Sequence, residues 1–151
     1  MKKILCLGIV FIVTILLTIG CSKIDSFEHI TGTGDKVTLS LDTSDGYDFV
    51  RGKCFVVECD DEEISTGTFI SADKYSDSVE DVLNNDDSKI IKSDANDDFE
   101  YIFYNEGKSY NYLVLIKNSK SGVLIENTIS EKSAEECFKH LDFKLYQKEA
   151  P

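Results

Sequence analysis

The sequence predicts an α+β domain in which a mostly antiparallel sheet is packed by two helices. Three observations lead to this prediction. Segments in which apolar and polar residues alternate, as in half-buried strands, recur along the chain after residue 35. Residues 73–85 and 130–141 instead carry apolar side chains at helical spacing. Short turns rich in Asp, Asn and Gly join the expected strands, as in antiparallel hairpins.

Residues 36–70 predict three strands joined by short acidic turns, an arrangement typical of an antiparallel meander. Val37, Leu39 and Leu41 alternate with polar residues in the first strand. The second combines residues 49–50 and 54–58, and Gly52 predicts a kink or an extra turn between these parts. The third alternates through residues 64–70.

The two helices differ in their expected caps. Asp73 is the expected N-cap of the first helix, whose apolar face comprises Tyr75, Val79, Val82 and Leu83. Ser130 or Ser133 caps the second helix, and Ser133 with Glu136 fits a capping box. The apolar stripe of the second helix comprises Ala134, Cys137, Phe138 and Leu141.

The clearest hairpin comprises residues 99–104 and 109–117, with Gly107 at or near its turn. Both faces of this hairpin are apolar, so we expect it in the middle of the sheet and covered on both sides. Its tyrosines suit a binding surface or packing against a helix, and packing is the simpler interpretation; they are Tyr101, Tyr104, Tyr110 and Tyr112. Further strands are expected at 89–93, 123–129 and 142–147.

The order of elements is strands, helix, strands, helix over residues 36–147. This order is similar to that of the Mog1/PsbP-like α/β/α sandwich. The resemblance implies a sheet with helices on both faces.

The N-terminus has the layout of an export signal, because Lys2 and Lys3 precede an uncharged, apolar segment at residues 4–20. The segment ends in Leu17-Thr18-Ile19-Gly20-Cys21, which resembles the lipobox of bacterial lipoproteins. The resemblance implies cleavage between Gly20 and Cys21 and a diacylglyceryl group on the Cys21 thiol. An uncleaved membrane anchor and an ordinary secretory signal are the alternatives.

This interpretation divides the chain into a signal peptide at 1–20, a lipidated N-terminus with a flexible tether at 21–35, and a single domain at 36–148. The expected location is the cell membrane, with the domain facing outside the cytoplasm. Two acyl chains hold a protein on a membrane where one is marginal. Apart from the diacylglycerol on Cys21, we expect no cofactor.

The formal net charge of −12 argues against nucleic acid as a partner, because no basic patch could neutralise its phosphates. The cysteines also bear on the exported domain. Cys54 and Cys59 would point to opposite faces of one strand and could not bond to each other. A disulfide from Cys54 or Cys59 to Cys137 is therefore the candidate pairing, and free buried thiols are the alternative.

The sequence shows no familiar catalytic constellation. Cys137 and His140 lie one helical turn apart, a spacing that suits a nucleophile and its base, but Cys137 belongs to the apolar stripe and we interpret it as a core residue. Asp94, Asn96 and Asp98 occupy the first three ligand positions of a calcium loop. The glycine and the bidentate glutamate of an EF-hand are missing, so these residues are weak candidates and no metal site is predicted.

We therefore expect a non-enzymatic protein-binding module of the cell envelope, with an envelope or extracellular protein as its partner. An immunity-type lipoprotein that intercepts a toxin is one form of this function, and the acidic charge would attract a cationic partner. The alternatives are a hydrolase that uses an unrecognised carboxylate pair and a lipoprotein that binds a small ligand or a cation.

Overall fold

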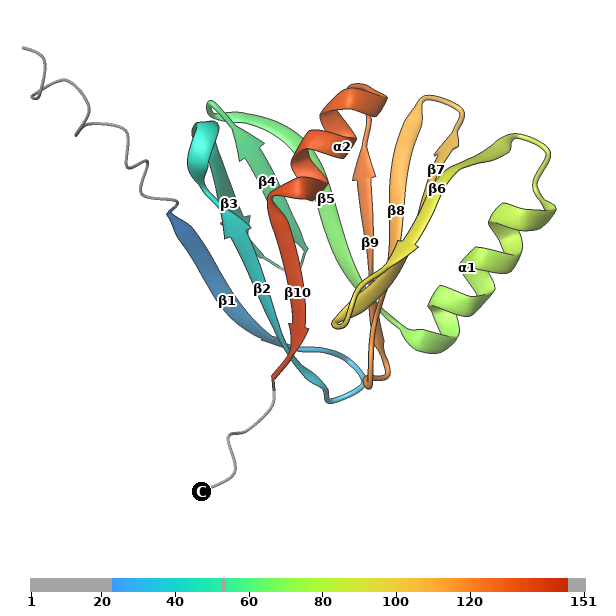
Figure 1. The fold of residues 1–151 in the computed structure, drawn as a ribbon, viewed down its shortest axis with the longest axis horizontal. Coiled ribbons are helices and arrows are strands. Elements are labelled where there is room, and N and C mark those ends of the chain that lie inside the picture. Colours follow the sequence, from blue (N-terminus) through green and yellow to red (C-terminus); the bar gives the residue numbers. More distant parts are fainter. Residues whose placement is uncertain (1–22, 53, 147–151) are drawn as a thin grey trace, which may run out of the picture.

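The computed structural model describes residues 23–52 and 54–146, which form two antiparallel sheets and two α-helices (Figure 1). The predicted α+β class and the predominantly antiparallel pairing are therefore confirmed. The predicted signal peptide, the lipobox-like segment and Cys21 lie outside the described residues.

The smaller sheet has three strands in the order β1-β2-β10. Its strands are β1 (Ile24–Ile30), β2 (Lys36–Asp42) and β10 (Leu141–Leu145). β2 pairs with both neighbours, and Val37, Leu39 and Leu41 are fully buried on its inner face. The alternation that predicted this strand thus marks the side that faces the core.

The larger sheet has seven strands in the order β3-β4-β5-β9-β8-β7-β6. A short 3₁₀ turn, η1 (Ser44–Gly46), leads into it from the smaller sheet. Its strands are β3 (Tyr47–Arg51), β4 (Phe55–Cys59), β5 (Glu62–Ser71), β6 (Ser88–Ala95), β7 (Phe99–Glu106), β8 (Ser109–Ile116) and β9 (Ser121–Asn127).

Two features of the sheets differ from the prediction. The meander consists of β3, β4 and β5, whereas the strand at residues 36–42 belongs to the smaller sheet. β9 is the central strand of the larger sheet, and the β7–β8 hairpin lies toward one edge. The hairpin is nevertheless covered on both faces where β8 passes between the two helices, since β8 packs against both.

The predicted tether at 21–35 is wrong for residues 24–30, because these residues form β1 and pair with β2 along their whole length. The inner face of β1 carries Asp25, Phe27 and His29. The ring of Phe27 meets that of Phe49 edge to face, and His29 stacks on Phe69 with centroids 4.2 Å apart. A single apolar residue on this face gave too weak an alternation to predict the strand.

The two helices cover opposite faces of the larger sheet (Figure 1). α1 (Ala72–Asn84) packs on one face through a cluster that contains Tyr75, Val82 and Leu113. α2 (Glu131–Lys139) packs on the other face beside the smaller sheet, and Ala134 and Cys137 are buried there.

The helix caps refine the predicted boundaries. Ser71, not Asp73, caps α1, because the Ser71 hydroxyl accepts a hydrogen bond from the Lys74 amide at 3.1 Å. Ser130 caps α2 by accepting from the Ser133 amide at 3.1 Å. Glu136 pairs with Lys139 instead of completing a capping box with Ser133. Leu83, expected on the apolar face of α1, instead points to solvent, with 66% of its surface exposed.

Candidate functional site

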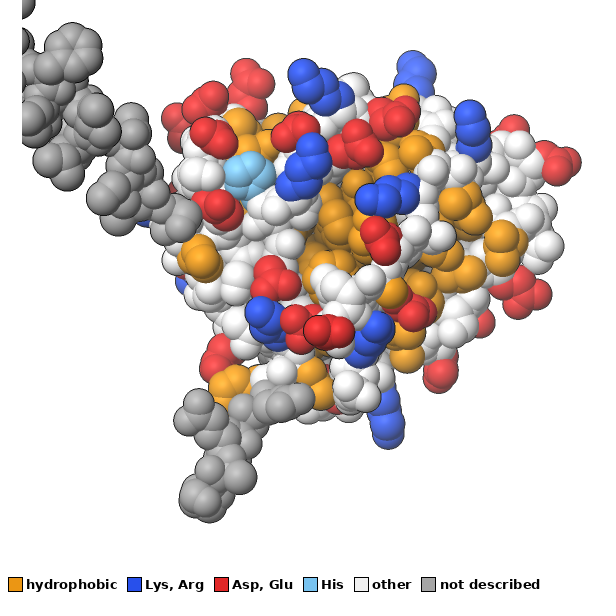
Figure 2. All heavy atoms as spheres, viewed as in Figure 1, with side chains coloured by type: hydrophobic (Ala, Val, Ile, Leu, Met, Phe, Trp, Pro, Cys, Tyr) orange, Lys and Arg blue, Asp and Glu red, His pale blue; other side chains and the backbone are white. Residues whose placement is uncertain are grey.

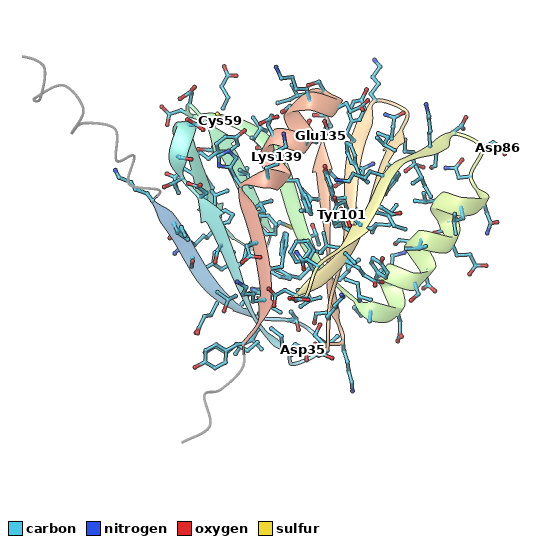
Figure 3. The ribbon with its side chains drawn as sticks, in the orientation of Figure 1. Asp35, Cys59, Asp86, Tyr101, Glu135 and Lys139 are labelled. Carbon is cyan, nitrogen blue, oxygen red and sulfur yellow. The ribbon has the colours of Figure 1, made fainter. Side chains whose placement is uncertain are left out.

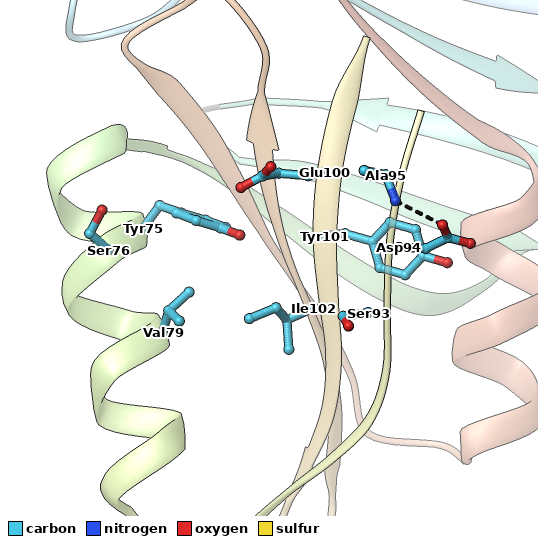
Figure 4. A pocket seen from close by; sticks show the side chains of 9 residues that line it. All are labelled: Tyr75, Ser76, Val79, Ser93, Asp94, Ala95, Glu100, Tyr101 and Ile102. Atoms are coloured by element: carbon cyan, nitrogen blue, oxygen red, sulfur yellow. Dashed lines mark hydrogen bonds between the residues drawn. The ribbon is translucent and has the colours of Figure 1, made fainter. Parts of the chain in front are cut away.

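A groove of about 590 Å³ lies between α1 and the β6–β7 edge of the larger sheet (Figure 4). Each of three elements contributes part of its lining, which comprises Tyr75, Ser76 and Val79 from α1, Ser93, Asp94 and Ala95 from β6, and Glu100, Tyr101 and Ile102 from β7. The groove therefore combines a helix face with the last two strands of the sheet.

Helix and strand periodicity bring the side chains of the groove together. Tyr75 and Val79 are one helical turn apart on α1, so both project toward the sheet. Ile102 belongs to the cluster packed under α1. Ser93 is paired with Ile102, and directly opposite residues in an antiparallel ladder share a face, so Ser93 also points toward α1.

Tyr75 supplies a polar group to the groove. Its side chain is 8% exposed, and Figure 4 shows its hydroxyl directed from α1 toward β7 near Glu100. Burial raises the pKa of Tyr75, and the nearby negative charge of Glu100 raises it further. Within the described residues the hydroxyl has no hydrogen-bond partner, so it can donate a hydrogen bond to a ligand in the groove.

Carboxylates predominate around the groove. Asp94 and Glu100 belong to its lining, Glu100 on the side of α1 and Asp94 with its side chain on the opposite face of the strand pair, beside Tyr101. α1, which forms one wall, contains four acidic residues and a single basic residue, Lys74; the acidic ones are Asp73, Asp77, Glu80 and Asp81. The groove therefore favours a ligand with positive charge.

The outer edge of β6 is unpaired, since β6 is the last strand of its sheet and pairs with β7 alone among the described strands. The Asn96 amide donates to the Phe99 carbonyl at 2.9 Å, so the peptide groups of Asn96 point toward β7. Hydrogen-bonded positions alternate along an antiparallel strand, so the peptide groups of Asp94, two residues earlier, also point toward β7. Ser93 and Ala95 accordingly direct theirs outward. The Ala95 amide donates to the Asp94 carboxylate at 2.9 Å (Figure 4).

The opposite face of the β6–β7 pair borders a hollow whose floor is hydrophobic (Figure 2). Tyr101 points into the space between β6 and α2 (Figure 3), and its ring lies 4.8 Å from that of Phe138. Phe138 stacks in turn on Tyr112. Lys92 lies over the ring of Tyr101 at 5.8 Å, a cation–π contact at the rim. Both sides of this strand edge thus offer contact surface.

A second, smaller cavity of about 210 Å³ lies at the C-terminal end of α1. The side-chain amide of Asn85 donates to the Glu106 carboxylate there, at 2.8 Å. The Ser88 hydroxyl is buried without a hydrogen-bond partner, and burial raises the pKa of Tyr104 to about 12. A polar cavity of this size suits ordered water, which would satisfy the Ser88 hydroxyl.

The weak cation candidates do not converge on a common centre. Asp94 binds the Ala95 amide, and the Asn96 side-chain oxygen accepts from the amides of Asp98 and Phe99 at 2.9 and 2.8 Å. Asp98 lies 3.8 Å from the Lys144 ammonium. Among residues 23–52 and 54–146, no group of three or more His, Cys, Asp or Glu side chains is placed to hold a metal ion.

Neither candidate disulfide is present in the structure, where Cys54, Cys59 and Cys137 are free thiols. Cys54 precedes β4 and Cys59 ends it, so the strand separates them. Cys59 donates to the Asp45 carbonyl at 3.6 Å, and Cys54 accepts from the Thr68 hydroxyl at 3.5 Å. Each thiol therefore has its own local polar contact.

Cys137 and His140 do not form a nucleophile–base pair. Burial raises the pKa of Cys137 to about 11, although a hydrogen bond with Ser65 opposes this effect. The thiolate required for nucleophilic attack is therefore scarce at neutral pH. A ring nitrogen of His140 instead interacts with the Asp42 carbonyl at 2.8 Å, and the ring stacks on Tyr47. Both residues serve packing between the two sheets.

The sequence analysis named Tyr75, Asp94 and Tyr101 for separate reasons but did not predict the groove, because no local motif joins its residues. Tyr75 was expected on the apolar face of the first helix, and that placement is correct. Glu100 and Ser93 meet it only through the pairing of β6 with β7. Of the hairpin tyrosines, Tyr104 and Tyr112 are buried, as the packing interpretation requires, while Tyr101 stays half-buried at the hollow.

Comparison with protein families, with characterised proteins and with solved structures finds no match for this chain. None of the helices in the described part of the chain is long and apolar enough to cross a membrane.

Proposed function

We propose that this chain is a membrane-anchored lipoprotein of the cell envelope that acts as a non-enzymatic protein-binding module facing outside the cytoplasm. The observation that carries the binding function is the groove beside the open edge of β6, where a helix face, carboxylates and unpaired peptide groups lie together. The anchoring rests on the resemblance of residues 17–21 to a lipobox.

The surface of the groove supports binding of a protein segment more than catalysis. Its two lining carboxylates differ in their surroundings, because Asp94 binds the Ala95 amide and lies 3.7 Å from the Lys92 ammonium. Glu100 lies near the Tyr75 hydroxyl (Figure 4). The apolar side chains of Val79 and Ile102 complete the surface. A mixed surface of this kind can hold a peptide through hydrogen bonds, charge and apolar contact together.

Binding is tested by cross-linking in native cells, with the wild-type chain compared with a groove variant. Tyr75 contributes packing as well as its hydroxyl, so Glu100→Gln is the more conservative change, and Glu131→Gln on α2 is a matched control. We expect one partner to be recovered with wild type and Glu131→Gln and to be depleted with Glu100→Gln. Equal recovery with all three proteins would show that the groove is not the binding site. Recovery of no partner with any of them would refute the protein-binding function.

Anchoring is tested separately by Cys21→Ser, compared with Cys6→Ser as a control within the same N-terminal segment. Loss of the acceptor thiol should release the chain from membranes or leave an uncleaved precursor, since lipid attachment supplies the affinity for the bilayer. Unchanged size and unchanged partition into the detergent phase for Cys21→Ser would refute lipid anchoring without bearing on the groove.

A further inference from the structure

We propose that a basic, extended segment of the partner protein adds to the outer edge of β6 as a further strand of the larger sheet. This inference rests on the proposed function, since it specifies how the protein-binding groove engages its partner. It identifies the partner by chemistry, as an extended peptide with cationic side chains on one face.

The backbone of β6 provides the first part of the argument. The peptide groups of Ser93 and Ala95 point away from β7, and β6 has no second neighbour among the described strands. The Ala95 amide is held by the Asp94 carboxylate from the adjacent residue. A carbonyl of an added strand can replace that carboxylate, and the Ser93 amide and carbonyl can pair with the same strand.

The surfaces on either side of β6 provide the second part. Side chains of an added strand would alternate between the two faces of the sheet. One set would enter the groove at α1, where the Tyr75 hydroxyl is directed toward β7 and Glu100 adds negative charge. The other set would face the hollow, where Tyr101 and Phe138 are half-buried aromatic side chains. Basic and apolar residues in alternation match these two surfaces.

Charge distinguishes this occupant from a second copy of the chain. α1 carries four acidic residues, Asp73, Asp77, Glu80 and Asp81, and the whole chain has a formal net charge of −12. Pairing β6 with β6 of another copy would bring two acidic grooves together, and like charges oppose such an association. A cationic segment is attracted by the same charges.

The probe is a labelled peptide of alternating Lys and Val that matches the eight residues of β6, titrated into the full-length chain in non-ionic detergent. Two comparison peptides test the charge of the segment and its backbone pairing separately. One replaces every Lys by Glu, and the other carries N-methyl groups on alternate amides, which removes hydrogen-bond donors along one edge. We expect both to bind at least about tenfold more weakly than the Lys–Val peptide.

The decisive variant is Ser93→Pro, with Ser93→Ala as its control. Proline removes the outward amide of residue 93 but leaves the ladder to β7 intact, because an edge strand tolerates proline where its amide faces solvent. Alanine removes the hydroxyl and keeps the amide. We expect Ser93→Pro to weaken binding at least about tenfold and Ser93→Ala to change it less than about twofold. Thermal unfolding of each variant verifies that the fold is retained.

The outcomes separate this inference from the proposed function. Equal binding of all three peptides, or of wild type and Ser93→Pro, would overturn strand addition. If cross-linking in cells recovers a partner equally with wild type and Ser93→Pro, the protein-binding function holds and strand addition at β6 is refuted. Concentration-dependent dimers of wild type that disappear in Ser93→Pro would instead assign the edge to a second copy. If thermal unfolding shows that Ser93→Pro has lost the native fold, the comparison of the Lys–Val peptide with its N-methylated form decides between the outcomes.

Discussion

The ring of Phe138 on α2 stacks on the ring of Tyr112 on β8, with centroids 3.8 Å apart and planes 6° from parallel. Tyr112 stacks on Phe103 of β7 in the same way, at 4.3 Å and 11°. The stack therefore joins α2 to two adjacent strands of the larger sheet. Phe138 also lies 4.8 Å from Tyr101, which points into the hollow beside β6, so the surface offered to a partner is continuous with the core.

Replacing Phe138 with Ala should destabilise the domain, because it removes one end of this stack and leaves a void against Tyr112. Full truncation of a buried Phe costs about 3–5 kcal/mol, and the half-burial of Phe138 places the expected loss at about 2–4 kcal/mol. Urea denaturation measures this loss of unfolding free energy. Lys139→Ala, at the exposed next position, should stay within about 0.5 kcal/mol. A similar small effect for Phe138→Ala would show that the stack does not anchor α2.

The N-cap of α1 provides a second prediction. The Ser71 hydroxyl accepts from the Lys74 amide at 3.1 Å, so Ser71→Ala should lower the unfolding free energy by about 1 kcal/mol. Asp73 lies in the first turn and acts only through the helix dipole, so Asp73→Ala should cost about 0.3–1 kcal/mol and lose that effect at high salt. Denaturation at low and high salt distinguishes the two, and the reverse ranking would mean that Asp73 is the cap.

The incorrect prediction of Asp73 as the N-cap of α1 shows a limit of local sequence patterns. Ser71 and Asp73 are both good capping residues, and β5 continues to Ser71 before the helix begins. The alternation of β5 therefore overlaps the helix signal, and the sequence placed the boundary two residues late. The α+β class did not depend on such details, because it follows from the periodicity of whole segments.

The candidate site could not be predicted to the same degree. Tyr75 was recognisable as part of an apolar helix face, but its contact with Glu100 depends on which strands are neighbours. Strand order is set by the whole sheet rather than by a local motif. β1 shows a related limit, since its inward face combines Phe27 with Asp25 and His29 and lacks the apolar repeat of a typical half-buried strand.

Close packing within the larger sheet makes Gly67 irreplaceable. A Cβ atom at Gly67 would lie 1.9 Å from the Cζ atom of the Phe55 ring, and Phe55 is 2% exposed in the core. Gly67→Ala should therefore force Phe55 to move, at a cost of about 1–3 kcal/mol or more. Gly32→Ala is the control, because nothing lies within 4 Å of a Cβ atom there. Comparable thermal stability of the two variants would show that the Phe55 ring shifts without penalty.

Asp35 ties the β1–β2 turn to the β8–β9 turn (Figure 3), and this tie should depend on pH. Its carboxylate accepts from the Ser121 hydroxyl at 2.8 Å, the Lys120 amide at 2.7 Å and the Thr33 hydroxyl at 3.0 Å. Burial opposes ionisation, but these hydrogen bonds prevail and hold the pKa of Asp35 below its ordinary value of 3.8. A carboxyl with a lowered folded-state pKa stabilises the fold above its unfolded-state pKa, and this contribution is lost as the pH falls through the folded-state value.

Asp35→Asn should therefore lower the melting temperature at neutral pH, because an amide is a weaker acceptor for these three donors than a carboxylate. The difference from wild type should shrink as the pH falls from about 5 toward 2, where Asp35 of the wild type becomes protonated. Melting curves of both proteins across this range measure the effect. Asp86→Asn, at an exposed position beyond α1, serves as the control and should run parallel to wild type. A pH-independent gap for Asp35→Asn would mean that the ionised carboxylate does not stabilise the two turns.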